Sequence, residues 1–207
     1  MAYILGYFAA DGSMYKNPRG RHYISFTSSD LELIQIVKTV LKVPNSIETY
    51  QSKKHLNWKI RYTLQIGSKT LFSKLLELGF TPAKSLSLTF PMIPNNLICH
   101  FIRGYFDGDG NAYYKLSKRL NRVGHAKHLR LSFRCGSKKF LEILRVSIEN
   151  LCQAGPGSLS YYSKAFSLAY SGTNVIKLYG FLYPNKSILH LTRKRLKLEE
   201  GIRFLGP

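Results

Sequence analysis

Two aspartates occupy the same place in two copies of one nonapeptide, and paired carboxylates of this kind can bind a divalent cation. Residues 4–12 read ILGYFAADG and residues 102–110 read IRGYFDGDG, so six of the nine positions are identical and Asp11 lies 98 residues before Asp109. We expect each copy to form a helix that ends at its aspartate, with Gly12 or Gly110 in a left-handed cap conformation. A carboxylate is disfavoured at this end of a helix, because the helix dipole is already negative there.

A bound Mg²⁺ would explain why acids stand at both helix ends. Carboxylates and main-chain carbonyl oxygens suit this ion, and water and a phosphate group can fill its remaining positions. The candidate metal ligands are therefore Asp11 and Asp109, with the carbonyl groups of Ala10 and Gly108. The competing interpretation is that each Asp-Gly pair only makes a turn after its helix, which is common for a single copy. The duplication favours the metal site.

The small residues of each copy predict that the two helices touch. Gly6 and Ala10 lie one helical turn apart on one face, and so do Gly104 and Gly108. Small residues at this spacing let two helix backbones approach closely. We expect the two helices to pack across a pseudo-twofold axis, which would bring the two aspartates side by side.

The elements that follow each nonapeptide also repeat. Hydrophobic periodicity predicts the order helix, two strands, helix, two strands, helix in both halves, and a basic helix at residues 188–201 closes the chain. The fold class is therefore α+β, with two similar units in tandem. Pro91 and Pro94 interrupt helix formation just before the second copy, so we place the boundary between residues 1–94 and 95–207.

The charge of the chain predicts a polyanionic partner. Thirty-one Lys and Arg against eleven Asp and Glu give a formal net charge of +20 in 207 residues, and 44% hydrophobic residues can build a core. Nucleic acid is favoured over an anionic membrane surface, because the chain contains no continuous amphipathic basic helix. No apolar run approaches the ~18 residues of a membrane span, and the N-terminus lacks signal-peptide features. We expect an intracellular protein, in a bacterial cytoplasm or an organelle matrix.

Strand alternation predicts which side chains face that partner. In the strand around residues 22–28, Ile24 and Phe26 should face the core. In residues 57–67 the core-side set should be Trp58, Ile60, Tyr62 and Leu64. The opposite faces carry hydrogen-bonding side chains suited to base edges and phosphates: Arg21, Tyr23, Ser25, Thr27, Asn57, Lys59, Arg61, Thr63, Gln65, Lys115, His128, Arg130, Ser132 and Arg134. For any one of them, a solvated sheet face is an equally good interpretation.

The two nonapeptides resemble the signature helices of the LAGLIDADG homing endonucleases, in the single-chain form that carries both motifs. The resemblance implies a pseudo-symmetric monomer of two αββαββα halves, each with a curved antiparallel sheet in the DNA major groove. It implies that Asp11 and Asp109 bind the catalytic metals. It also implies that the enzyme cuts both strands of a long, pseudo-palindromic target across the minor groove, leaving 3′ overhangs. One departure is visible: the inner aspartate of the signature is present as Asp107 but is Ala9 in the first copy.

The resemblance also implies a catalytic lysine after the second helix of each half. By position the candidates are Lys84 and Lys194, and in the second half Lys186 and Arg193 compete with Lys194. An ordinary phosphate-binding or solvated lysine is the alternative for each. For the whole chain, the alternatives to an endonuclease are an intron RNA splicing maturase, a DNA-binding regulator without catalysis, and a purely structural basic protein.

Overall fold

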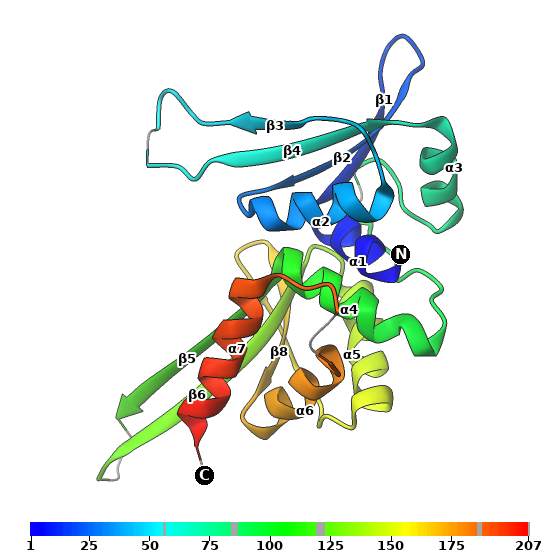
Figure 1. The fold of residues 1–207 in the computed structure, drawn as a ribbon. Coiled ribbons are helices and arrows are strands. Elements are labelled where there is room, and N and C mark those ends of the chain that lie inside the picture. The colour runs from blue at the N-terminus through cyan, green and yellow to red at the C-terminus, as the bar shows by residue number, and fades with distance from the viewer. Residues whose placement is uncertain (56, 84–86, 119–122, 186–187, 207) are drawn as a thin grey trace. The chain divides into compact units, whose positions relative to one another are not determined.

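The computed structural model describes residues 1–55, 57–83, 87–118, 123–185 and 188–206. The element order helix, two strands, helix, two strands, helix occurs twice, and a last helix follows, as the sequence predicts (Figure 1). The chain divides into two compact units, Met1–Gly108 and Asp109–Pro207. The boundary at residue 94 stays a prediction about where the second copy of the repeat begins.

The first unit contains one four-stranded antiparallel sheet in the order β1-β2-β4-β3. Its helices are α1 (Ala2–Asp11), α2 (Leu31–Leu41), α3 (Lys69–Glu77) and most of α4 (Asn95–Asp109). Its strands are β1 (Gly12–Lys16), β2 (His22–Ser28), β3 (Ile47–Tyr50) and β4 (Arg61–Gly67). Helices α1 and α2 pack against β2.

The second unit repeats this plan with the sheet order β5-β6-β8-β7. Its strands are β5 (Gly110–Lys118), β6 (His125–Cys135), β7 (Ser158–Tyr162) and β8 (Ala165–Ser171). Its helices are α5 (Lys138–Cys152), α6 (Thr173–Leu182) and α7 (Thr192–Leu205). Helix α7 packs along β5 and β6, and α5 packs on β6 and β8 (Figure 1).

Each sheet buries the face that the alternation of its strands predicts. In the first unit Ile24, Phe26 and Leu64 are buried, and the ring of Phe8 from α1 meets the ring of Phe26 edge-on at 5.6 Å. In the second unit Leu131, Phe133 and Leu168 are buried, as are Phe140 and Leu144 of α5. Helices and apolar side chains thus cover one face of each sheet, and alternate polar side chains point to the other face.

One predicted strand is shorter than the alternation suggests. Strand β4 begins at Arg61, so Asn57 and Lys59 lie in the preceding loop. The predicted core positions of Trp58 and Ile60 are wrong, because these residues are 54% and 37% exposed. The reason is a turn, in which the amide of Trp58 donates a hydrogen bond to the carbonyl oxygen of His55 at 3.0 Å. A turn of this kind breaks the two-residue period that a strand needs.

No helix in the described ranges is both long and apolar enough to cross a membrane.

Candidate active site and nucleic-acid interface

Helices α1 and α4 meet through two glycines, as the spacing of small residues predicts. A Cβ atom added at Gly6 would overlap the carbonyl oxygen of Phe101, and one added at Gly104 would overlap the carbonyl oxygen of Tyr3. The two backbones are therefore in direct contact, and no larger residue fits at either position. All four residues belong to the first unit.

The two contacts are equivalent under the repeat. The offset of 98 residues that relates Gly6 to Gly104 also relates Tyr3 to Phe101. Gly6 touches Phe101 and Gly104 touches Tyr3, so the repeat converts one contact into the other. This reciprocity is the mark of an isologous, twofold contact. The predicted pseudo-twofold packing of the two motif helices is confirmed for α1 and for α4 up to Gly108.

At the C-terminal end of this seam, Gly108 lies against the end of α1. A Cβ atom at Gly108 would collide with the Cβ of Ala10 and would stand 3.2 Å from Oδ2 of Asp11. Asp11 is half-buried and is the last residue of α1. Gly108 is followed in the same helix by Asp109, whose side chain is exposed. The candidate metal ligands of the first unit, Ala10, Asp11 and Gly108, are therefore neighbours.

The expected left-handed glycine caps are wrong. Gly12 has φ −75° and ψ 151°, which is extended backbone, and Gly110 is not among the residues with positive φ. Both glycines are instead the first residues of strands β1 and β5, because the chain passes from each helix directly into a strand. A glycine is still required at position 12, since a Cβ there would overlap the ring and the carbonyl oxygen of Phe8.

Where the first copy of the motif has Ala9 in place of the signature aspartate, the residue that would face this aspartate is also changed. The hydroxyl of Tyr3 donates a hydrogen bond of 2.8 Å to Oδ2 of Asp107, and both side chains are buried. The repeat relates Tyr3 to Phe101 and Asp107 to Ala9. Donor and acceptor are therefore both replaced by apolar groups on the other side of the seam, which leaves no buried hydroxyl there without an acceptor.

In the second unit, Lys194 lies beside the end of the second motif. Its side chain is buried, with 7% exposure, and Nζ donates a hydrogen bond of 2.6 Å to the carbonyl oxygen of Gly110, the residue after Asp109. Burying an ammonium group costs free energy unless the group is hydrogen-bonded, and the bond to Gly110 offsets this cost. The competing Arg193 is exposed on α7. Lys84 and Lys186 lie outside the described residues.

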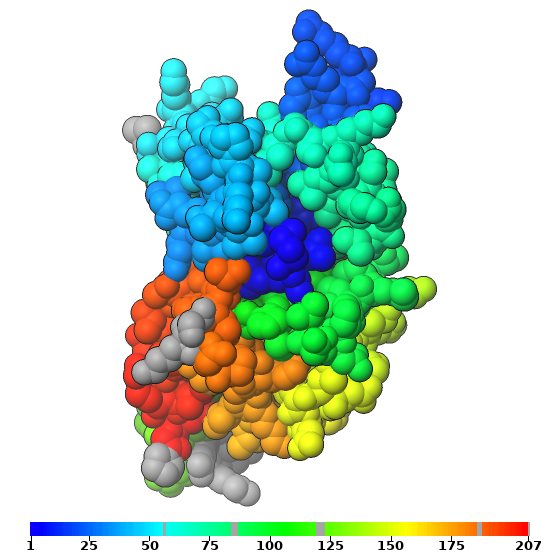
Figure 2. Space-filling view, turned by 45° about the vertical axis from the view of Figure 1, so that its right-hand side comes forward, coloured from blue at the N-terminus to red at the C-terminus, as the bar shows by residue number. Residues whose placement is uncertain are grey.

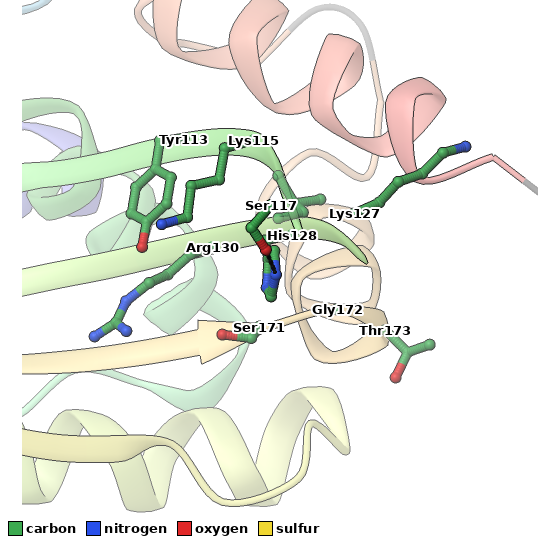
Figure 3. Close-up of a pocket in the computed structure, with 10 residues that line it drawn as sticks. Tyr113, Lys115, Ser117, Lys127, His128, Arg130, Ser171, Gly172 and Thr173 are labelled. Atoms are coloured by element: carbon green, nitrogen blue, oxygen red, sulfur yellow. Dashed lines mark hydrogen bonds between the residues drawn. The ribbon is translucent and has the colours of Figure 1, made fainter. Parts of the chain in front are cut away.

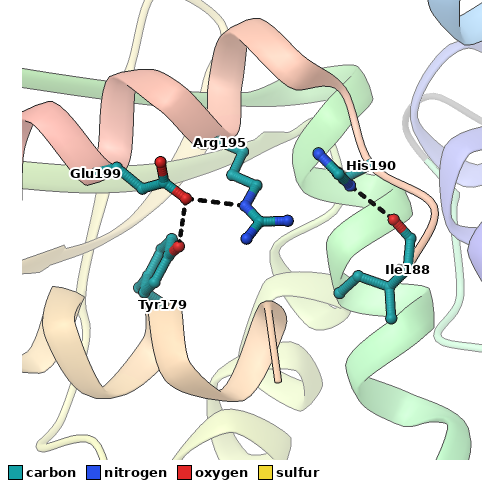
Figure 4. A network of polar contacts seen from close by, with 5 residues as sticks. All are labelled: Tyr179, Ile188, His190, Arg195 and Glu199. Carbon is teal, nitrogen blue, oxygen red and sulfur yellow. Dashed lines mark hydrogen bonds and ion pairs between the residues drawn. The ribbon is translucent and has the colours of Figure 1, made fainter. Parts of the chain in front are cut away.

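A polar network anchors α7, which carries Lys194, to α6. Oε1 of Glu199 accepts hydrogen bonds from the hydroxyl of Tyr179 at 2.6 Å and from Nε of Arg195 at 2.9 Å (Figure 4). The hydrogen bond from Tyr179 is the main reason why the pKa of Glu199 lies below its ordinary value. The guanidinium of Arg195 also lies over the ring of Tyr183, and Nδ1 of His190 is 2.6 Å from the carbonyl oxygen of Ile188.

The helix-free face of the first sheet carries the side chains predicted for it on β2 and β4. The register places Ser25 opposite Gln65 and Thr27 opposite Thr63, and the two threonine hydroxyls are 3.0 Å apart. Arg61 shares this face. Arg21 lies just before β2 and is exposed, near the tip of the β1–β2 hairpin, which stands out from the first unit in Figure 2.

The corresponding face of the second sheet is strongly basic. Lys115 pairs with His128, whose Nε2 is 2.7 Å from the hydroxyl oxygen of Ser117, and Arg130 pairs with Tyr113. These side chains line an open depression of about 580 Å³ together with residues of β8 and the start of α6 (Figure 3). Within the residues that line it there is no acidic side chain.

Two predicted contacts are less accessible than expected. Ser25 and Ser132 lie on the predicted faces but are 8% and 9% exposed. Each is a short side chain on a central strand, flanked by a strand on either side, so neighbouring side chains cover it. Arg134 is exposed as predicted, and its guanidinium donates hydrogen bonds to the carbonyl oxygens of Tyr162 and Ser163.

Of the polar residues on strands β1 and β5, sequence reasoning named only Lys115 as a contact. Strand β1 places Ser13 and Tyr15 on the same face as Ser25 and Tyr23. Tyr15 stacks on Tyr23 at 5.3 Å and accepts a hydrogen bond from Nε2 of Gln65. The sequence signal was short, because Met14 is a single apolar residue between Ser13 and Tyr15. In the structure Gly12 and Met14 are buried, whereas Ser13 and Tyr15 are exposed. Strands β5 and β8 add further polar residues to the second face: Asn111, Tyr113, Ser117, Ser167 and Ser171.

In the described part of the chain, no group of three or more His, Cys, Asp or Glu side chains could hold a metal ion. Any metal site at the seam would therefore combine carboxylates with main-chain oxygens rather than form a closed cage of side chains.

Comparison with known proteins gives two findings. Residues 1–78 match the family model of the LAGLIDADG-like domain, whereas no curated protein matches the sequence. Among solved structures, the I-LtrWI LAGLIDADG homing endonuclease bound to target DNA is similar with a TM-score of 0.64 and 13% identity, over 98% of this chain and 88% of that one.

Two further solved structures have a similar fold. The LAGLIDADG meganuclease I-AabMI bound to uncleaved DNA is similar with a TM-score of 0.64 and 13% identity, over 98% of this chain and 89% of that one. The homing endonuclease I-WcaI bound to its DNA recognition sequence has a TM-score of 0.63 and 15% identity, over 95% of this chain and 84% of that one. Residues 1–78 therefore match a LAGLIDADG-like domain, and the chain has the fold of the LAGLIDADG homing endonucleases over nearly its whole length.

Proposed function

We propose that the chain is a site-specific DNA endonuclease that makes a double-strand break by metal-dependent hydrolysis and leaves 3′ overhangs. The observation that carries the proposal is the reciprocal packing of α1 on α4, which sets Oδ2 of Asp11 against Gly108. Because Asp109 follows Gly108 in α4, we propose that the carboxylates of Asp11 and Asp109 serve one site.

The donor atoms at the helix ends fit Mg²⁺. A half-buried carboxylate, a second carboxylate and the carbonyl groups of Ala10 and Gly108 are oxygen ligands, which this ion prefers. When bound, the ion would polarise the phosphate and lower the pKa of a water molecule that attacks phosphorus. The acids Asp11 and Asp109 would hold it in place at the close seam, where no side chain larger than those present fits.

Lys194 would act on the phosphate side. Its hydrogen bond to Gly110 fixes the ammonium group one residue beyond Asp109, so a positive charge stands ready where negative charge develops on the phosphate. The anchoring of α7 through Glu199 keeps this group in position. For the first unit, Lys84 is the proposed counterpart.

The two helix-free sheet faces would read the DNA. The first offers Tyr23, Thr27, Arg61, Thr63 and Gln65, with Arg21 at the hairpin end, and Asn57 and Lys59 would contact the backbone from their loop. The second offers Lys115, His128, Arg130 and Arg134, a set suited to phosphates and guanine edges. Because the two faces carry different side chains, the chain would act as a monomer on a long target whose halves are related but not identical.

The relatives support this reading of the faces, because the I-LtrWI, I-AabMI and I-WcaI structures are each described as bound to DNA. A randomised duplex library, incubated with the protein and Mg²⁺ and sequenced at the cut ends, tests activity and specificity together. The proposal predicts one recovered site motif with 3′ overhangs. Binding to DNA or intron RNA without cleavage would contradict it and favour a maturase or a regulator.

A further inference from the structure

The loop between β3 and β4 carries an exposed aromatic pair that the proposed cleavage does not use. The rings of His55 and Trp58 are stacked, with centroids 4.4 Å apart and planes 18° from parallel. His55 covers part of the indole, yet more than half of the Trp58 side chain remains exposed. The exposed part of the indole offers a flat apolar surface on which another ring can stack.

The loop is held in shape by its own hydrogen bonds. The hydroxyl oxygen of Ser52, a buried side chain, accepts a hydrogen bond from the amide of His55 at 3.1 Å, and the carbonyl oxygen of His55 accepts one from the amide of Trp58. The two rings are thus stacked on a defined turn, which lowers the conformational entropy that a ligand would otherwise have to remove.

The second unit has no comparable structure at the equivalent place. There the hairpin from β7 to β8 turns through Ser163 and Lys164 alone, both with positive φ, whereas residues 51–60 connect β3 to β4. A two-residue turn is the minimal solution for a hairpin. The longer loop of the first unit is therefore an addition to the repeated fold, and long ordered loops commonly carry function.

The aromatic pair lines an open pocket of about 630 Å³ with a basic rim. Its walls include Tyr50, Lys53 and Lys54 as well as Trp58, all exposed, and no lining residue is acidic. Tyr50 pairs with Arg61, so the pocket continues the face that is proposed to meet DNA. Flat aromatic walls suit a planar base, and two lysines suit the phosphates beside it.

We propose that this pocket binds an unpaired nucleobase of a nucleic-acid strand, which stacks on Trp58 while Lys53 and Lys54 contact the flanking phosphates. Bases inside a duplex present only their edges in the grooves, so stacking on the indole requires a base that is out of the helix. The pocket is therefore a site for single-stranded nucleic acid or a displaced base, distinct from groove reading. It does not depend on cleavage, and failure of the endonuclease proposal would leave it standing.

The tryptophan fluorescence of the protein comes from this pocket alone, because Trp58 is the one tryptophan of the sequence. Titration of the whole protein with a short oligoadenylate should quench the tryptophan fluorescence saturably. An oligomer of the same length with abasic sugars carries the same phosphates and should not quench it. Deoxy and ribo oligomers form separate arms, and quenching by either supports the site and identifies the sugar that it accepts. Equal quenching by the abasic oligomer, or none by any oligomer, would overturn the proposal.

Affinity measured by anisotropy of a labelled oligoadenylate gives the second test. Trp58→Ala should weaken binding about 5- to 150-fold, the effect of losing one base–aromatic stack, and Trp58→Phe should keep most of the affinity. The matched control is Tyr161→Ala. Tyr161 is an exposed aromatic residue like Trp58, but it lies on the β7–β8 hairpin of the second unit, outside the pocket. Equal affinity of the Ala and Phe variants would contradict stacking on this ring.

Discussion

The hydroxyl of Tyr3 donates a hydrogen bond to the buried carboxylate of Asp107, across the seam between α1 and α4. The repeat places Phe101 and Ala9 at the equivalent positions, so the seam is symmetric in its backbone contacts and asymmetric in this one polar pair. The asymmetry favours the observed register, because a shift of α1 along α4 would take the hydroxyl of Tyr3 away from the buried carboxylate of Asp107.

Tyr3→Phe removes only the donor of that pair. We expect the free energy of unfolding to fall by about 1–3 kcal/mol, the cost of leaving a buried polar group without this partner. Urea denaturation followed by circular dichroism measures the change. Tyr15→Phe is the control, since the hydroxyl of Tyr15 is bonded to Gln65 at an exposed site, and it should change stability by less than about 0.5 kcal/mol. Equal effects of the two variants would refute the role of Tyr3.

Gly6→Ala and Gly104→Ala test the backbone contact itself. Each added methyl group would overlap a carbonyl oxygen, so the helices must separate, and we expect a loss of about 1–3 kcal/mol or more. Thermal unfolding measures it. The matched control is Gly180→Ala in α6, where nothing lies within 4 Å of the added atom. That variant should be neutral or gain up to about 1 kcal/mol from helix propensity.

Much of this seam could be predicted from the sequence. The repeat gave the element order, and the small-residue spacing gave the faces of α1 and α4, because both depend on local periodicity. The conformation of Gly12, the polar side chains of β1 and the exposure of Trp58 were missed. Each depends on something that periodicity does not encode: the direction in which the chain leaves a helix, the pairing of an edge strand with β2, and a turn held by His55.

The burial of Lys194 could not be predicted from the sequence either. The family resemblance implies a lysine after the second helix of this half, but Lys186 and Arg193 fitted that position nearly as well as Lys194. Only the packing of α7 on β5 and β6 separates the buried Lys194 from the exposed Arg193.

Lys194→Met should slow cleavage with little effect on DNA binding. The substitution keeps an unbranched side chain but removes the charge beside the motif, and we expect the cleavage rate to fall about 100-fold. Single-turnover cleavage and a binding titration on the same duplex separate the two effects. Arg193→Met, on the exposed surface of the same helix, should leave the rate within about threefold of wild type. A parallel loss of binding in Lys194→Met would assign the lysine to affinity instead.

Tyr179→Phe tests how α7 is anchored. The hydrogen bond from Tyr179 lowers the pKa of Glu199, so the stabilisation is present above the ordinary carboxyl pKa and is lost as the pH falls through the lower pKa of the folded state. We expect the variant to be less stable than wild type by about 1 kcal/mol at pH 7, since Glu199 is partly exposed. The difference should shrink below about pH 4. A difference that is constant with pH would show that the ionised carboxylate is not involved.

The central claim is that Asp11 and Asp109 serve one hydrolytic site. The most direct measurement is single-turnover cleavage of the selected duplex by Asp11→Asn and by Asp109→Asn, with binding measured on the same DNA. Asparagine keeps the shape of aspartate but removes the charge that would hold the metal. Each variant alone should lose double-strand cleavage while binding the duplex nearly as well as wild type, and Glu77→Gln, an exposed carboxylate on α3, should cut normally. Wild-type cleavage by either aspartate variant would contradict the account.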